Sequence, residues 1–409
     1  MVALGVAMAR AAVGAGDVAP VLVLPASKAA VQLAVPLPEQ VKAENHGAWQ
    51  LVAADGAAPP IPLELLPAVG ADGTVEEGRA QLAAGIPARD GGAAAREFQL
   101  RRAAASPASQ TGGFRFQDTS AASLGLWEGD RPVMVYNHGM VTVERVPAKD
   151  ARRTRACSIH PLWGLQGEVL TDDAPGDHTH HRGVFWAWPH ITIDGREYDL
   201  WVYNNIKQKF VRWLGRAAGP VAASLGVENG WFIGDTKVMI ERVWMRTYQA
   251  DATQRAVDIE LVLIPVGRPI TLVGAPGKSY GGLNVRYAPR EGTRITVPSG
   301  PTKEDLPDTP LAWADLTAHF KDPHARSPSG AAVFVDPAHP DYPPTWLTRH
   351  YGILCVGWPG VKGKTFEPGK PIRLGYRIWI HASAVDTETL QDAYDAYAAG
   401  RKARWRPPQ

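Results

Sequence analysis

The sequence lacks the features that would tie it to a membrane or to nucleic acid. None of its 409 residues belongs to a run of 18 or more apolar residues, so we expect no membrane-spanning helix. The 43 basic and 41 acidic residues leave a net charge of +2, which argues against binding of nucleic acid or anionic lipid. There are two cysteines, Cys157 and Cys355, each inside an apolar run. We expect buried free thiols, with one long-range disulfide as the alternative.

Motifs of the familiar enzyme classes are also missing. The sequence contains neither HExxH nor GxSxG, and it shows no internal repeat. GWPGVKGKT (357–365) resembles a phosphate-binding loop, but its first glycine is one residue too far from Gly363, Lys364 and Thr365, and strands are expected on both sides of it. We therefore predict no nucleotide site.

Glycine and proline, by contrast, are abundant, at 41 and 35 residues, and they divide the chain into short apolar runs. Such runs continue from Phe114 to His381 without amphipathic helices between them. At 257–263, aliphatic residues alternate with Asp258 and Glu260, as in a strand with one buried face. This pattern favours a mostly β protein built on a large antiparallel β-sandwich.

Composition divides the chain into five segments. Residues 1–19 are apolar and end in small residues but lack a basic start, as in a signal remnant or a disordered tail. We therefore expect a periplasmic or secreted protein, with a cytoplasmic location as the alternative. Residues 20–103 predict a smaller N-terminal β-sandwich, 104–113 a linker of small and polar residues, and 114–385 the main β-sandwich with the site.

The last segment, 386–409, predicts a C-terminal helix and tail. Leu390, Tyr394 and Tyr397 recur at helical spacing after Asp386, which is a suitable N-cap residue. We expect this helix to pack against a sheet.

Histidine is concentrated in one segment. Five of the 12 histidines fall between positions 160 and 190, and His178, His180 and His181 precede an aromatic strand in GDHTHHRGVFWAW (176–188). Imidazoles titrate near neutrality, so a cluster is typical of acid–base chemistry or metal binding. His190, which follows Pro189, is expected to be structural.

Three interpretations of the cluster stay open. The histidines form a metal-free site, or a hydrogen-bonded structural loop, or a metal site in which His178 and His180 project to the same side of an extended chain. We predict no cofactor, with a divalent metal on this pair as the alternative. The adjacent Arg182 would bind a substrate carboxylate or form an internal salt bridge with Asp177 or Asp199.

Aromatic and polar side chains point to a saccharide ligand. Two of the 14 tryptophans, Trp186 and Trp188, would share one strand face, where an exposed indole can stack on a sugar; burial in the core is the alternative. Polar side chains also alternate along 278–286, and a proline-stiffened loop, PDYPPTWLTRH (340–350), would form a cleft rim. The residues concerned are Lys278, Tyr280, Asn284 and Arg286 in the first segment, and Trp346, Arg349 and His350 in the second.

Four segments carry a resemblance to a known family. IHPLWG with GEVLTDDAPGDHTHHRGVFWAW, GKSYGGLNVRYAPR, DLPDTPLAWADL and FVDPAHPDYPPTWLTRHYGILCVGWPGV together resemble the bacterial PmoA-like family over most of residues 114–381. Cys157 and Ser158 depart from it, where an aromatic residue is expected. The family name comes from a membrane subunit of methane monooxygenase, but the absence of an apolar span argues against methane oxidation.

The resemblance implies a protein of bacteria that degrade complex polysaccharides. It further implies a fold similar to the galactose mutarotase supersandwich, whose enzymes use a histidine and a carboxylate across a sheet. The resulting hypothesis is an enzyme that acts on a sugar or oligosaccharide by hydrolysis, elimination or epimerisation. The alternatives are a non-catalytic carbohydrate-binding or envelope scaffold protein, and a metal-dependent oxidoreductase that uses the histidine pair.

Roles follow from this hypothesis. The expected catalytic residues are His160, His180, His181, Glu228 and His350, with Asp177 and Asp315 as alternative carboxylates. Substrate binding is assigned to Arg182, Trp186, Trp188, Lys278, Tyr280, Asn284, Arg286, Trp346 and Arg349. The sequence does not indicate the substrate, the linkage or the oligomeric state.

Overall fold

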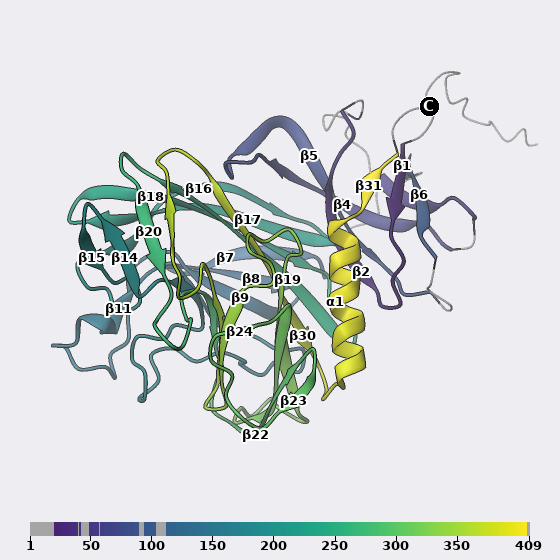
Figure 1. The fold of residues 1–409 in the computed structure, drawn as a ribbon. Helices are drawn as coiled ribbons and strands as arrows, with labels where there is room; N and C mark the ends of the chain where they lie inside the picture. Colours follow the sequence, from purple (N-terminus) through teal and green to yellow (C-terminus); the bar gives the residue numbers. More distant parts are fainter. Residues whose placement is uncertain are drawn as a thin grey trace, which may run out of the picture.

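The computed structural model describes residues 20–39, 41, 49–56, 58–89, 94–103 and 112–406 (Figure 1). The expected signal remnant at 1–19 and most of the expected linker lie outside these residues. Within them the chain forms β-strands, one 3₁₀ turn, η1 (Ala151–Arg153), and one α-helix, α1 (Thr387–Arg401). The prediction of a mostly β protein with a C-terminal helix is confirmed.

The N-terminal unit is one antiparallel sheet of seven strands that nearly closes on itself. Its strands, in spatial order, are β2 (Val31–Pro36), β5 (Val75–Ile86), β4 (Ile61–Val69), β3 (Trp49–Ala53), β6 (Arg96–Arg102), β1 (Val21–Leu24) and β31 (Arg404–Trp405). The last strand comes from the far end of the chain, with Leu22 opposite Trp405. The Trp405 indole donates to the carbonyl of Pro36 at 2.7 Å, so the two edges of the sheet approach each other.

Two large antiparallel sheets of nine strands each form the main unit. The first, here called the site sheet, runs in the order β24 (Thr309–Pro310), β27 (Thr345–Arg349), β28 (Ile353–Gly357), β21 (Gly282–Arg286), β13 (Val184–Ala187), β12 (Ser158–Leu162), β9 (Arg131–Asn137), β8 (Ser123–Glu128), β7 (Phe114–Ser120). The second, the opposing sheet, runs in the order β16 (Lys207–Ala218), β17 (Ala222–Ile233), β18 (Thr236–Tyr248), β19 (Gln254–Pro265), β30 (Ile372–His381), β26 (Ser329–Val335), β25 (Trp313–Phe320), β22 (Arg290–Val297), β23 (Gly300–Thr302).

Two small sheets complete the described strands. One joins β15 (Arg196–Tyr198), β14 (His190–Ile193), β20 (Ile270–Val273) and β29 (Lys364–Phe366), and the other joins β10 (Val141–Thr142) and β11 (Thr154–Arg155).

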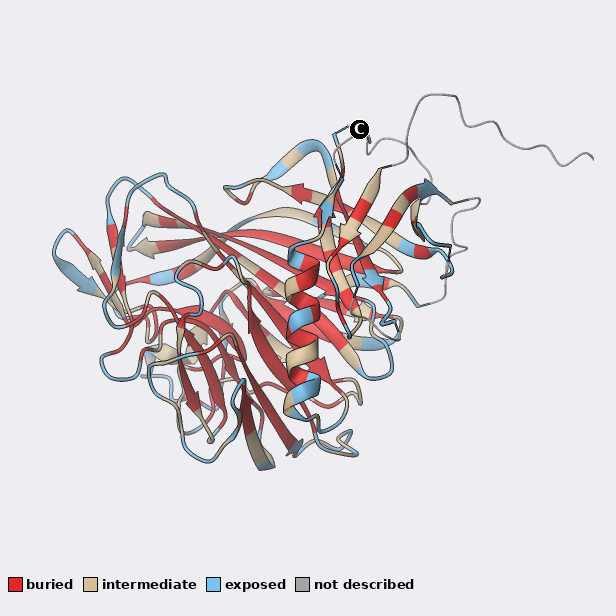
Figure 2. Cartoon of the chain, turned by 45° about the vertical axis from the view of Figure 1, so that its right-hand side comes forward, coloured by how far each residue is buried: buried red, intermediate tan, exposed pale blue. Residues whose placement is uncertain are grey.

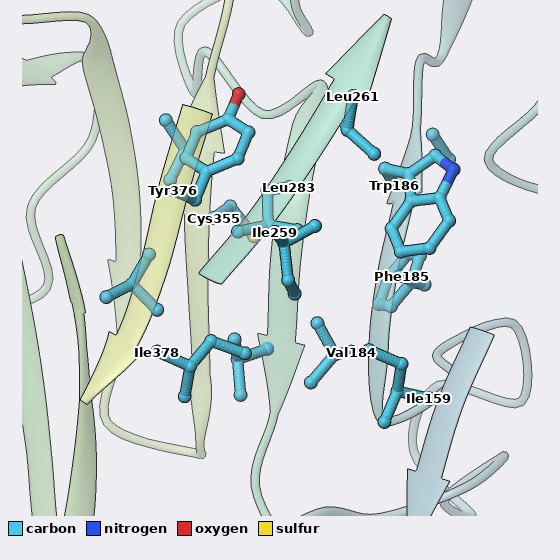
Figure 3. Close-up of a cluster of buried hydrophobic side chains, with 14 of the residues drawn as sticks. Ile159, Val184, Phe185, Trp186, Ile259, Leu261, Leu283, Cys355, Tyr376 and Ile378 are labelled. Atoms are coloured by element: carbon cyan, nitrogen blue, oxygen red, sulfur yellow. The ribbon is translucent and has the colours of Figure 1, made fainter. Parts of the chain in front are cut away.

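The main core lies between the two large sheets. Figure 3 shows Val184 and Trp186 of the site sheet facing Ile259 and Leu261 of the opposing sheet, and all four side chains are fully buried. Each such burial stabilises the fold by about 1.5–3 kcal/mol. The alternation predicted at 257–263 is thus observed, since the intervening Asp258 turns away and binds Arg377.

Helix α1 covers the outer face of the opposing sheet with its buried side (Figure 2). Its N-cap, Asp386, accepts a hydrogen bond from the Thr389 amide at 2.8 Å, as predicted. Leu390, Tyr394 and Tyr397 pack against the opposing sheet, and Ala396 and Ala399 pack against the N-terminal sheet. The helix therefore holds the two units together.

Both cysteines are buried and free, so the expectation of reduced thiols is confirmed over the disulfide alternative. No helix within the described ranges is long and apolar enough to cross a membrane.

Candidate functional site

The histidine-rich loop lies on the face of the site sheet turned away from the core. Val184 and Trp186 point into the core, so Phe185 between them points to the other face. There the ring of His181 lies 5.7 Å from Phe185, and Trp201 lies 5.3 Å from it. The sheet therefore provides a rigid floor for the loop.

Gly183 allows the loop to enter this sheet. Its φ of +53° lies in the left-handed region, and a Cβ atom there would stand 2.2 Å from the carbonyl oxygen of Ile159. No other residue type fits this turn, which places His181 and Arg182 directly before β13.

The three histidines stack with a tyrosine from another strand connection. The ring of His178 is parallel to that of His181 at 4.6 Å and to that of Tyr351 at 4.9 Å. His180 meets His181 edge-on at 4.5 Å. Residues some 170 positions apart in the chain thus share one cluster, here called the ring cluster: His178, His180, His181 and Tyr351.

Two of these imidazoles are neutral. Burial, followed by the neighbouring His178, lowers the pKa of His180 to about 3. Burial and the other two histidines likewise lower the pKa of His181, which is 2% exposed. The Nδ1 atoms of His178, His180 and His181 are all buried and have no hydrogen-bond partner in the described part of the chain. At neutral pH the rings of His180 and His181 can exchange hydrogen bonds, but they carry no charge.

A carboxylate lies against the ring cluster. Asp177 accepts two contacts from one terminal nitrogen of Arg286, at 2.8 and 2.9 Å, and its carboxylate lies 3.0 Å from Nδ1 of His178. Partial burial would raise the pKa of Asp177, but the contacts with His178 and Arg286 lower it overall. Asp177 is therefore ionised at neutral pH and held beside an imidazole.

A pocket of about 370 Å³ opens next to this pair. It shares Arg286 and Tyr351 with the site just described, and we call it the basic pocket. Its lining residues are Asp172, Arg286, Tyr287, Pro289, Arg290, Thr293, Lys321, His350 and Tyr351. The histidine loop meets the turn that follows the 340–350 segment at Tyr351, which stacks on His178 and also lines this pocket.

Other predicted residues lie nearby in supporting positions. His160 approaches Thr171 Oγ1 with its Nδ1 at 3.1 Å, and burial lowers its pKa. Arg182 is buried and binds Asp173 at 3.0 Å, so the internal salt bridge is observed, with a different aspartate from those expected. Tyr280 packs on Trp201 at 4.5 Å between ring centres.

His350 lines the basic pocket but has no nitrogen to offer a ligand. Its Nδ1 lies 2.9 Å from Asp305, and its Nε2 lies 3.1 Å from the carbonyl of Thr302. Both ring nitrogens thus face oxygen atoms of the protein rather than the pocket. Arg349 binds the same Asp305 at 3.2 Å. The assisting catalytic role expected for His350 does not fit this geometry.

The expected tryptophan platforms are wrong. Trp186, Trp188 and Trp346 are fully buried, and the indoles of the last two donate to the carbonyls of Trp358 and Leu311 at 2.7 and 2.8 Å. A ring without exposed surface cannot stack on a sugar. These three residues are buried in the core, which was the alternative prediction.

Two of the polar residues that were expected to bind a ligand along 278–286 do not line the basic pocket. Asn284 is fully buried and donates to the carbonyl of Gly282 at 2.7 Å, while Lys278 is exposed in the loop before β21. Arg286 is the member of this set that reaches the basic pocket.

Glu228 does not lie at the ring cluster. It sits on the opposing sheet and binds Arg212 at 2.9 Å and Arg242 at 3.0 Å, on the side of the N-terminal unit. Asp315 is likewise buried against His381 at 2.9 Å. Of the three carboxylates considered, Asp177 is the one beside the histidines.

Sequence reasoning missed Tyr351, Arg290 and Arg155. The first two stand inside segments that carry the family resemblance, next to His350 and after Arg286, and this proximity was the available signal. Arg155 is buried and donates to the carbonyls of Leu200 and Trp201 at 3.0 and 2.9 Å, which fixes the loop that covers Phe185.

Within the described residues, the histidine pair lacks a third side chain placed to complete a metal site. The rings of His178 and His180 lie 5.6 Å apart at an angle of 76°. Across the residues described by the structure, no group of three or more His, Cys, Asp or Glu side chains is arranged to hold a metal ion.

Comparison with known proteins gives a family but no activity. No curated protein matches the chain. Residues 124–395, more than half of the sequence and all of the site above, match the family described as "Family of unknown function (DUF6807)". The chain therefore belongs to the DUF6807 family.

Proposed function

We propose that this protein is a carbohydrate-active enzyme in which Asp177 and His178 form the acid–base pair. The observation that carries the proposal is the 3.0 Å contact between them, against Arg286 and Tyr351, which line the basic pocket. Both side chains reach solvent, with 46% of Asp177 and 34% of His178 exposed, whereas His181 is buried. A proton-transfer group has to reach its substrate, and these two can.

The contacts assign a role to each member of the pair. Arg286 fixes the Asp177 carboxylate, whose negative charge lies 3.0 Å from Nδ1 of His178 and would stabilise a positive charge on that ring during proton transfer. Nε2 of His178 then takes a proton from a substrate hydroxyl or carbon and returns it to a leaving group. His181 and Tyr351 hold the ring between them, and His180 and His181 act as neutral hydrogen-bond partners.

Sugars are the ligand class that best suits the groups around Asp177 and His178. Tyr351 is 42% exposed, and its ring, which stacks on His178 and lies under the Arg286 guanidinium, places an aromatic group beside polar groups, as in saccharide sites. The two large antiparallel sheets accord with the galactose mutarotase-like fold that the family resemblance implies, and the PmoA-like resemblance points to polysaccharide degradation. Hydrolysis, elimination and epimerisation each need one proton acceptor and one donor.

The test is a screen of neutral and acidic oligosaccharides, read by mass spectrometry, with the wild type and variants. His178→Gln is expected to reduce turnover by about 100-fold or more, because general acid–base catalysis contributes at that level. His190→Gln is the matched control, since His190 also lies against a carboxylate, Glu197, at 2.7 Å with similar exposure but outside the pocket. Full turnover by His178→Gln would contradict the proposal.

A second candidate is a non-catalytic carbohydrate-binding protein. The neutral state of His180 and His181 favours it, because such imidazoles suit hydrogen bonding better than proton transfer. It predicts that oligosaccharides bind without any product, and that His178→Gln changes only the affinity.

A further inference from the structure

Arg290 carries a charge that no carboxylate in the described chain neutralises directly. Its guanidinium donates to the backbone carbonyls of Ala288, Tyr287 and His350 at 2.8, 3.3 and 3.2 Å. Among the residues with described positions, no acidic side chain lies within 4.0 Å of its nitrogens. Burial, followed by the charge of Arg286, lowers its pKa to about 10, so it remains cationic at neutral pH.

Arg286 adds a buried positive charge to the same wall. It is 6% exposed, and one of its terminal nitrogens donates to Asp177. Its Nε and its other terminal nitrogen are buried without a hydrogen-bond partner in the described residues. These buried nitrogens are not open to a ligand, so Arg286 contributes positive charge behind the pocket wall, which favours an anion in the pocket.

The backbone is shaped to admit the Arg290 guanidinium. Gly352 has a φ of +111°, and a Cβ atom there would stand 1.9 Å from a terminal nitrogen of Arg290. Only glycine leaves this space next to the pocket. The backbone at Gly352 therefore leaves room for the Arg290 guanidinium at this position.

The charges around the pocket favour a singly charged anion. Lys321 joins the two arginines, although Glu291 lies beside it at 3.0 Å. Asp172 is the one carboxylate of the lining, and burial raises its pKa. The Asp172 carboxylate would repel a phosphate dianion more strongly than a singly charged carboxylate. A planar carboxylate also matches the fork of a guanidinium.

We infer that the basic pocket binds the carboxylate of a uronic acid unit, so that the substrate class is an acidic oligosaccharide. This inference rests on the proposed function, since it places a charged sugar ring beside Asp177 and His178. Arg290 recognises the carboxylate, Arg286 adds positive charge behind it, and Tyr351 lies beside the sugar ring.

The experiment compares oligomers of galacturonic and glucuronic acid with their methyl esters by titration calorimetry. The wild type is expected to bind an acid form about tenfold or more tightly than its ester, because a charge-assisted pair is lost on esterification. Arg290→Gln should remove that preference, and Arg290→Lys should restore part of it. Arg294→Gln is the matched control, since Arg294 lies on the same strand, donates to the carbonyl of Val385 and is outside the pocket lining.

The outcomes separate this inference from the proposed function. Equal binding of acid and ester, or an unchanged preference in a folded Arg290→Gln variant, overturns the inference while leaving a sugar-binding protein in place. If no sugar binds but simple carboxylates or inorganic phosphate bind through Arg290, the carbohydrate proposal and the uronate inference both fail, and the pocket is a general anion site. Acid preference that depends on Arg290 supports the inference even where no turnover is seen.

Discussion

At the scale of single residues, the imidazoles of His180 and His181 occupy a place where positive charge is unfavourable. Burial and neighbouring histidines lower the pKa of both, to about 3 for His180. The histidine-rich motif indicated proton chemistry at this loop, but it did not show which ring is buried. Exposure depends on the turn at Gly183 and on the cover provided by Trp201, which are tertiary features.

This environment predicts a loss of stability in mild acid. The unfolded chain protonates His180 below about pH 6.5, whereas the folded protein holds it neutral down to about pH 3, so acid favours unfolding. The stabilisation is complete above pH 6.5 and decreases as the pH falls, by up to about 1.4 kcal/mol per pH unit.

Urea unfolding at about pH 7.5 and pH 5.5 measures this effect. His180→Gln should lose about 1 kcal/mol less than the wild type on acidification, because the buried titrating group is gone. His190→Gln, altered in an exposed pair with Glu197, should behave like the wild type. Identical pH dependence in His180→Gln and the wild type would contradict the assignment of a buried neutral ring.

Tryptophan shows where residue type alone misleads. All four residues of β13 are buried, because the core covers one face of the strand and the histidine and Trp201 loops cover the other. Trp186 and Trp188 therefore have no exposed face on either side. The alternation of a strand predicts which residues share a face, but it does not tell which faces remain open.

At the scale of elements, the sequence pattern predicted a strand or helix correctly where the pattern lies within that one element. The alternation at 257–263 gave a strand with one face in the core, and Asp386 with its helical spacing gave α1. Strand β31 could not be predicted, because it consists of two residues whose pairing with β1 joins positions about 380 apart in sequence. Such pairing depends on the path of the whole chain.

Helix α1 is expected to stabilise the protein through its buried side. Leu390 is fully buried among Trp313, Phe334 and Trp379, so Leu390→Ala should reduce the free energy of unfolding by about 2–5 kcal/mol. Glu388→Ala, on the exposed side of the same helix, should change it by less than about 0.5 kcal/mol. Chemical denaturation of both variants provides the comparison, and equal stabilities would show that the helix is not held as described.

At the scale of the whole molecule, the site combines segments that only the fold brings together. Asp177 and His178 come from the loop before β13, Arg286 from β21, and Tyr351 from the turn between β27 and β28. The sequence identified most of these segments, since the family resemblance covers them. It selected Glu228 as the leading carboxylate because nothing local reveals that this side chain faces the N-terminal unit.

The central claim is that Asp177 and His178 act as one unit on a sugar, and a double-mutant cycle of turnover tests it most directly. Once the oligosaccharide screen has supplied a substrate, kcat/KM is measured for Asp177→Asn, His178→Gln and the double variant. A working pair predicts that the double variant is about as slow as His178→Gln alone, because the second change removes a group that acts through the first. The account would be contradicted if the losses of transition-state stabilisation in the two single variants added in full in the double variant. It would also be contradicted by a double variant with wild-type turnover.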